Sequence, residues 1–291
     1  MHLVCSTLPF RKVDLKDALA GLRRFGFNTV ELCVDPIHSD PERWANNRDE
    51  ILRLLHRLQM KVNSVHVPMK EGNLRPHAPA FRKDATEQSL KTIDAAVLLG
   101  ADFIVQHVLL IADSSGSQQG YVLKNTVPDL EEVVQYAAAK RVQVAIENVP
   151  SSSFRMLGTS LQELVAVLQL FPPETVGLCL DLNHCLACGF DPREALTTMK
   201  IHRLISIHAS DNLYSPLADR HLPIGKGEIL WDKIFTRLSA LAFQGSFVIE
   251  VLDEKALMDS ISYLRSNDVL DLRKSLLPTI FDGDLEFPKR M

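Results

Sequence analysis

The stretch "LEEVVQYAAAKRVQVAIEN", Leu130 to Asn148, contains the pattern that decides the fold. Its first half repeats apolar residues at helical spacing, which is typical of an amphipathic helix. Its second half, "VQVAIEN", is a short and almost continuously apolar run that ends in Glu147 and Asn148. Such a run suits a strand whose two faces are both buried. A helix that leads into this kind of strand indicates one unit of a parallel α/β fold.

Runs of this kind recur along the chain at intervals of about 25 to 40 residues, with amphipathic stretches between them. The predicted strands cover residues 2–6, 29–34, 61–67, 102–108, 142–148, 175–181, 204–210 and 246–251. The last predicted helix lies near residues 258–277, and residues 111–125 are predicted to form a long loop. Eight such units predict a single (β/α)8 TIM barrel over residues 1–291. A doubly wound open sheet is the competing fold, but "CSTLPFRKVD" (5–14) lacks the Gly-rich loop expected after its first strand.

Composition places the chain among ordinary globular proteins. It has 291 residues, of which 46% are hydrophobic and 23% charged, with a formal net charge of −4. This charge argues weakly against a protein whose main task is to bind a phosphate backbone. The five cysteines lie mostly in apolar runs, as buried thiols do in a reducing compartment. Because no long apolar segment occurs, we expect a cytoplasmic protein without a membrane partner, and a homo-oligomer is compatible with the sequence.

Potential metal ligands cluster at the carboxyl ends of the predicted strands, where a TIM barrel places its active site. Glu31 lies within the second predicted strand. The loop "ADRHLPIGKG" (218–227) follows the seventh strand and adds an Asp-x-His pair. The ligand-type residues at or just beyond strand ends are His66, His107, Glu147, Asp181, His184, His208, Asp219, His221 and Glu250. A single polar residue at a strand end is usually only solvated, whereas this convergence predicts a functional site.

The charge pattern at these strand ends predicts a divalent cation. Three carboxylates that face one barrel mouth would repel one another, although a buried salt-bridge network is the structural alternative. Carboxylates and imidazoles without cysteine at the same rim positions suit Zn²⁺, Mn²⁺, Co²⁺ or Fe²⁺ better than Ca²⁺. We therefore expect a metal cofactor and no organic one.

Several runs together resemble the xylose isomerase-like barrel superfamily. They are "AIENVP" (145–150), "LDLNHCLACGFDP" (180–192), "SIHASDN" (206–212), "DRHLPIGKGEILWDKIF" (219–235) and "GSFVIEV" (245–251). The resemblance to its sugar phosphate isomerase/epimerase branch implies one metal, zinc, manganese or cobalt, held by Glu147, Asp181, His208 and Glu250. It also implies that Glu147 and Glu250 transfer protons through an enediolate. The implied substrate is a sugar, sugar phosphate, polyol or keto-acid, and a related dehydratase would begin with the same proton abstraction.

The endonuclease IV branch of the same superfamily gives a second hypothesis. It uses three zinc ions, and the chain has a matching residue type at all nine ligand positions, with His66, His107, His184, Asp219 and His221 added to the central four. Under this hypothesis the partner is nucleic acid and the reaction is phosphodiester hydrolysis at abasic sites. The runs "ENVPSSS" (147–153) and "DLNH" (181–184) depart from that branch's pattern, which favours small-molecule chemistry, where His184 would contact substrate or orient a ligand. A barrel that binds a ligand without catalysis is a third hypothesis.

Overall fold

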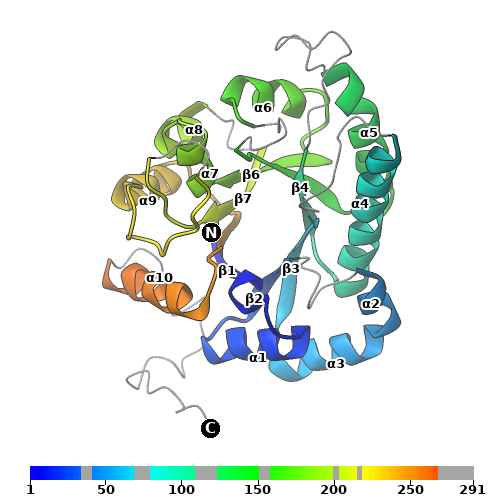
Figure 1. Ribbon diagram of the computed structural model, residues 1–291, viewed down its shortest axis with the longest axis horizontal. Helices are drawn as coiled ribbons and strands as arrows, with labels where there is room; N and C mark the ends of the chain where they lie inside the picture. The colour runs from blue at the N-terminus through cyan, green and yellow to red at the C-terminus, as the bar shows by residue number, and fades with distance from the viewer. Residues whose placement is uncertain are drawn as a thin grey trace.

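Eight parallel strands close into one barrel in the order β1 to β8, and helices surround it (Figure 1). The computed structural model describes residues 1–33, 41–68, 79–108, 123–150, 158–198, 203–214 and 218–267. The strands are β1 (His2–Ser6), β2 (Thr29–Cys33), β3 (Lys61–His66), β4 (Phe103–His107), β5 (Gln143–Glu147), β6 (Val176–Asp181), β7 (Leu204–Ala209) and β8 (Ser246–Ile249). The predicted (β/α)8 barrel is thus confirmed, and no strand boundary differs from the prediction by more than two residues.

The helices lie outside the strands and pack their apolar faces on them. They are α1 (Leu15–Arg24), α2 (Pro41–Asn46), α3 (Arg48–Leu58), α4 (Pro79–Leu99), α5 (Leu123–Ala139), α6 (Leu161–Leu168), α7 (Leu182–Ala187), α8 (Pro192–Thr198), α9 (Trp231–Ala240) and α10 (Glu254–Ser266). A short 3-10 helix, η1 (Leu8–Phe10), follows β1. Asp14 and Ser160 cap α1 and α6 by accepting hydrogen bonds from backbone N–H groups of the first turn. The described helices include none that is long and apolar enough to cross a bilayer.

A predicted loop and the end of a predicted helix lie mainly outside the described residues. The predicted loop over residues 111–125 lies outside the described residues except for its last three, which belong to α5. The end of the predicted last helix, from residue 268 onward, also lies outside them. The sequence pattern did not predict α2 or α7, because segments of six residues are too short to show helical periodicity.

The two-residue period of the strands sorts side chains between the helical shell and the barrel interior. In β5, Val144 and Ile146 join the large core beneath the helices, whereas Ala145 belongs to a smaller cluster inside the barrel. Glu147, two residues beyond Ala145, therefore also points inward. The same alternation in β6 places Cys179 in the inner cluster. The interior thus has an apolar lower layer and a polar upper layer at the carboxyl ends of the strands.

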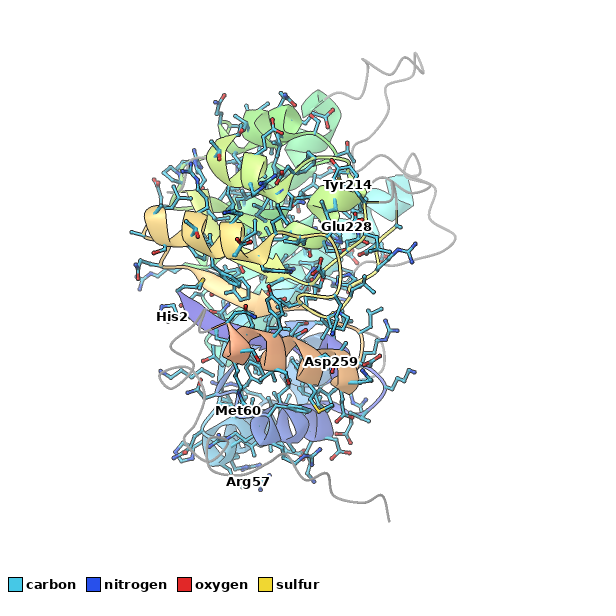
Figure 2. All side chains as sticks on the ribbon, turned by 90° about the vertical axis from the view of Figure 1, so that its left-hand side faces the viewer. His2, Arg57, Met60, Tyr214, Glu228 and Asp259 are labelled. Carbon is cyan, nitrogen blue, oxygen red and sulfur yellow. The ribbon has the colours of Figure 1, made fainter. Side chains whose placement is uncertain are left out.

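Figure 2 shows the barrel from the side. His2, at the start of β1, lies toward the end where the strands begin. Tyr214 and Glu228, which belong to the long loop after β7, lie toward the opposite end. This loop therefore lies at the end of the barrel where the polar layer of the interior is found.

Asp211 anchors the loop after β7. Its backbone pairs with Leu222 in an antiparallel bridge, with N–O distances of 2.8 and 2.9 Å. Its buried carboxylate accepts hydrogen bonds from the backbone N–H groups of Asn212, Gly225 and Ile229 at 2.9 to 3.1 Å. It also accepts one from the indole N–H of Trp231 at 2.8 Å. One buried carboxylate therefore holds both ends of the segment that carries Asp219 and His221.

Gly227 packs directly on this anchor. A Cβ atom there would lie 2.3 Å from the backbone oxygen of Asn212 and 2.3 Å from Oδ1 of Asp211. Neither oxygen belongs to a flexible side-chain end, because Asp211 is held by four hydrogen bonds. The position therefore requires glycine for its small size.

We expect Gly227→Ala to lower the free energy of unfolding by about 1–3 kcal/mol, because the added methyl group forces the loop away from its anchor. Urea denaturation followed by circular dichroism measures this change. Lys226→Ala, at the exposed neighbouring position, is the matched control and should change the free energy of unfolding by less than about 0.5 kcal/mol. Equal stabilities of the two variants would contradict the assigned role of Gly227.

Candidate metal centre

The central group of potential ligands lies at the carboxyl ends of four neighbouring strands. It consists of Glu147 of β5, Asp181 of β6, His208 of β7 and Glu250, which directly follows β8. Each offers one ligand atom, and these atoms all lie within 4.8 Å of one another. All four side chains are buried, and Asp181 and His208 are direct partners in the β6–β7 register. This spacing is suited to a single metal ion.

Two carboxylate oxygens of the central group have no hydrogen-bond partner among the described residues. Oδ1 of Asp181 accepts a hydrogen bond from the backbone N–H of His184 at 2.6 Å, but the buried Oδ2 has no hydrogen-bond partner. Oε2 of Glu250 has no hydrogen bond of acceptable geometry, although Nδ1 of His208 lies 2.9 Å away. Buried carboxylate oxygens of this kind are costly unless a cation meets them.

The pKa values of Asp181 and Glu250, which lie on either side of His208, reflect the same concentration of negative charge. Burial, together with the carboxylates of Glu147 and Glu250, raises the pKa of Asp181 to about 7. Burial also acts to raise the pKa of Glu250, but the imidazole of His208 outweighs it and lowers that pKa to about 2. Asp181 is therefore the carboxylate that most lacks a positive neighbour.

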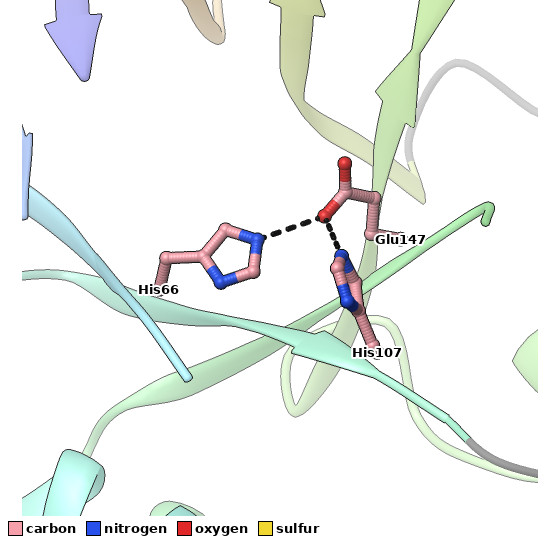
Figure 3. A group of neighbouring side chains, drawn as sticks. All are labelled: His66, His107 and Glu147. Atoms are coloured by element: carbon pink, nitrogen blue, oxygen red, sulfur yellow. Dashed lines mark hydrogen bonds and ion pairs between the residues drawn. The ribbon is translucent and has the colours of Figure 1, made fainter. Parts of the chain in front are cut away.

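A second group joins β3, β4 and β5, and Figure 3 shows it. Oε2 of Glu147 lies 3.1 Å from Nε2 of His66 and 2.7 Å from Nε2 of His107. Burial lowers the pKa of His66, but its hydrogen bond to Glu147 prevails and raises the pKa to about 9. Burial lowers the pKa of His107, and the rings of His66 and His184 add to this effect. The two imidazoles compete for one carboxylate oxygen, so we expect one to be protonated and the other neutral.

A third group lies under the loop after β7. Asp219 has Oδ2 at 3.4 Å from Nε2 of His184 and Oδ1 at 3.0 Å from Nε2 of His221. Burial opposes ionisation, but these two imidazoles hold the pKa of Asp219 well below its usual range. His221 has a φ of +43°, which side-chain-bearing residues rarely adopt. This backbone strain places its Nδ1 at 3.0 Å from the backbone oxygen of Glu250.

Two asparagines support these groups, and the residue pattern indicated no role for either. The side chain of Asn148 accepts a hydrogen bond from the backbone N–H of Asp181 at 2.8 Å and donates one to its carbonyl at 2.9 Å. This pair of bonds fixes the end of β6 against β5. Asn183, in α7, donates a hydrogen bond to Asp219. Of the two, only Asn148 has a sequence position that could have indicated a role, because it directly follows Glu147 at the end of β5.

Cys179 lies close to the ligands from below, in the apolar layer of the barrel interior rather than at a rim position. This residue precedes Asp181 by two positions in β6, so its side chain points into the barrel and comes within 4.8 Å of ligand atoms of Glu147 and His208. Burial raises the pKa of its thiol to about 12.

All nine residues predicted as site residues lie at this one end of the barrel, in three adjoining groups. Glu147 belongs to both the central group and the second group, so these two groups share one carboxylate. His184 links the first and third, because its backbone N–H bonds to Asp181 while its ring contacts Asp219. Glu31, which lies in β2, also reaches this region through His208.

Comparisons with known proteins agree with this architecture. An uncharacterized protein of Methanocaldococcus jannaschii, MJ1311, is 24% identical over 253 residues, which make up 86% of this chain and 83% of that protein. A probable endonuclease 4 of Oleidesulfovibrio alaskensis is 33% identical over 113 residues, but the match spans only 38% of that protein and 34% of this chain.

Solved structures match over almost the whole chain. A D-tagatose 3-epimerase-like protein has a TM-score of 0.78 at 22% identity, and the match covers 94% of this chain and 98% of that one. The IolI protein, solved with a zinc atom, has a TM-score of 0.73 at 18% identity, covering 95% of this chain and 100% of that one. These likenesses concern the fold. The family model described as xylose isomerase-like TIM barrel matches residues 19–267, and the chain therefore belongs to the xylose isomerase-like TIM barrel family.

Proposed function

We propose that this protein is a divalent-metal-dependent isomerase or epimerase that moves a proton between carbons of a small hydroxylated carbonyl compound. The observation that carries the proposal is the central group, in which three buried carboxylates and one imidazole converge with buried oxygens of Asp181 and Glu250 left without hydrogen bonds. These donor types fit Zn²⁺, Mn²⁺ or Co²⁺. The fold of the sugar epimerase-like neighbour supports the substrate class.

Glu147, Asp181, His208 and Glu250 would hold the metal. When bound, a divalent ion in this position supplies Lewis acidity toward a substrate carbonyl and the neighbouring hydroxyl. One glutamate beside that carbonyl can then remove the proton on the adjacent carbon. A proton is delivered either to the other face of that carbon, by the second glutamate, or to the next carbon. The first outcome is epimerisation and the second is isomerisation.

The two glutamates are not equivalent as proton carriers. Glu147 is held from both sides, since Oε2 contacts two imidazoles and Oε1 lies 3.1 Å from Nδ1 of His208. The carboxylate of Glu250 forms an ion pair with one imidazole, that of His208, at 2.9 Å. Glu250 is also 5% exposed, whereas Glu147 is fully buried. Glu250 is therefore the freer carboxylate and the one we assign as the base that first removes the proton.

Phosphodiester hydrolysis at a multinuclear zinc site is the second candidate, and the second and third groups favour it. His66, His107 and Glu147 form one complete set of three ligand atoms, and His184, Asp219 and His221 form another. These groups need a cation less than the central one does. Asp219 is already neutralised by two imidazoles and its side chain is 42% exposed, while Glu147 accepts from both rings of the second group. This difference in charge balance is why we place the single-metal enzyme first.

Metal content separates the two candidates. We expect purified protein, loaded with Zn²⁺ and then dialysed, to retain about one ion per chain, because the central group is the one of the three ligand groups with buried carboxylate oxygens that lack hydrogen bonds. Asp181→Asn should reduce this content to near zero, whereas Asp219→Asn should leave it unchanged. Elemental mass spectrometry provides the count. About three ions in the wild type and about two in Asp219→Asn would favour the hydrolase instead.

Proton transfer can be tested directly by solvent deuterium incorporation into a panel of ketoses, sugar phosphates and keto-acids. We expect metal-loaded protein to label at least one of them, and Glu250→Gln to slow the labelling by about 10²- to 10⁴-fold because an amide cannot accept the proton. Glu254→Gln, the same substitution at an exposed position in the first turn of α10, is the matched control. Cleavage of an abasic-site duplex that Glu147→Gln abolishes, with no labelling of any compound, would contradict this proposal.

A further inference from the structure

Glu31 is a fully buried carboxylate inside the barrel that belongs to none of the three ligand groups. It lies in β2, whose hydrogen-bonded neighbours are β1 and β3. Its carboxylate nevertheless meets a side chain of β7, because Oε1 and Oε2 lie 3.1 and 3.3 Å from Nε2 of His208. The contact therefore crosses the barrel interior and joins strands that are not adjacent in the sheet.

The two ring nitrogens of His208 face different surroundings. Nδ1 points into the central group, where it lies 2.9 Å from Oε2 of Glu250 and 3.1 Å from Oε1 of Glu147. Nε2 points away from that group and toward Glu31. A neutral imidazole carries one proton, and a nitrogen that binds a metal must be the one without it. The proton of a metal-binding His208 therefore belongs on Nε2, where Glu31 can accept its hydrogen bond.

The carboxylate of Glu31 is held in place by a chain of hydrogen bonds through Ser64, Asn63 and Ser246. Oε2 accepts a hydrogen bond from the hydroxyl of Ser64 at 2.7 Å, and Ser64 is the direct partner of Glu31 in the β2–β3 register. The hydroxyl of Ser64 in turn accepts a hydrogen bond from the amide of Asn63 at 3.0 Å. The amide oxygen of Asn63 accepts one from the hydroxyl of Ser246 in β8 at 2.8 Å. This chain of hydrogen bonds gives the carboxylate one defined orientation.

We propose that Glu31 is a positioning residue that fixes the ring of His208 with Nε2 protonated and Nδ1 free for the metal. A carboxylate behind a ligating histidine sets the tautomer, limits rotation of the ring and increases the electron-donating strength of the opposite nitrogen. Buried carboxylates otherwise lose free energy through desolvation, and the hydrogen bonds from Ser64 and His208 offset that loss at Glu31. The inference rests on the proposed metal centre and extends it beyond its direct ligands.

The test compares the Co²⁺ and Zn²⁺ affinities of the wild type, Glu31→Gln and Ser206→Ala by competition with a chelator of known affinity. Glu31→Gln keeps the size of the side chain but removes its charge, and we expect it to weaken binding of either ion by about 10- to 100-fold. Ser206→Ala is the matched control, because Ser206 is fully buried in β7, two residues before His208, and its hydroxyl has no hydrogen-bond partner. It should change the affinity by less than about twofold, and an affinity of Glu31→Gln within that same range would overturn the inference.

A second measurement uses only the wild type and does not depend on the folding of a variant. Long-range ¹H–¹⁵N spectra of the Zn²⁺-loaded protein, labelled in histidine, report which nitrogen of His208 carries the proton. We expect a protonated Nε2 and a metal-bound Nδ1, and the reverse assignment would overturn the role of Glu31. If the wild type binds neither ion, the proposed metal centre fails and the inference fails with it. If the wild type binds metal and either Glu31 result is negative, only the inference fails.

Discussion

The structure of the barrel mouth depends on how four buried carboxylates are neutralised. Glu31, Glu147, Asp181 and Glu250 are at most 5% exposed and face the same interior. Each ionised carboxylate in such surroundings loses hydration that must be replaced by hydrogen bonds or positive charge. Imidazoles from neighbouring strands supply much of this, and His208 alone contacts three of the four carboxylates. His208 therefore links β2, β5 and the end of β8 to β7 through its ion pairs with their carboxylates.

The same charge balance explains why the three ligand groups are unequal. In the second and third groups, each carboxylate has two imidazoles, so hydrogen bonds and ion pairs can satisfy it without a metal. In the central group, three carboxylates share one imidazole, and Asp181 has the weakest compensation. The nine ligand-type residues at the mouth therefore differ in how far their protein neighbours balance their charge.

Sequence patterns predicted the barrel and the place of nine ligand-type residues at its mouth because both follow from short-range rules. Buried parallel strands are apolar along their whole length, and a polar residue at the carboxyl end of such a strand must lie at the mouth. Contacts across the barrel follow no such rule. The contact between Glu31 of β2 and His208 of β7, which joins strands that are not neighbours in the sheet, could not be read from local periodicity. Asn183 was missed for a similar reason, since α7 is too short to have a recognisable pattern.

In the loop after β7, the residues that fix the path of the backbone differ from the residues that face the ligand groups. The path of the loop depends on Asp211 and the small size of Gly227, whereas the hydrogen bonds and ion pairs of Asp219 with described residues join it to the side chains of Asn183, His184 and His221. Substitutions at Asp219 can accordingly change the chemistry offered to a bound molecule while the backbone keeps its course. The side chains that this loop offers to a bound molecule are therefore set independently of the contacts that fix its path.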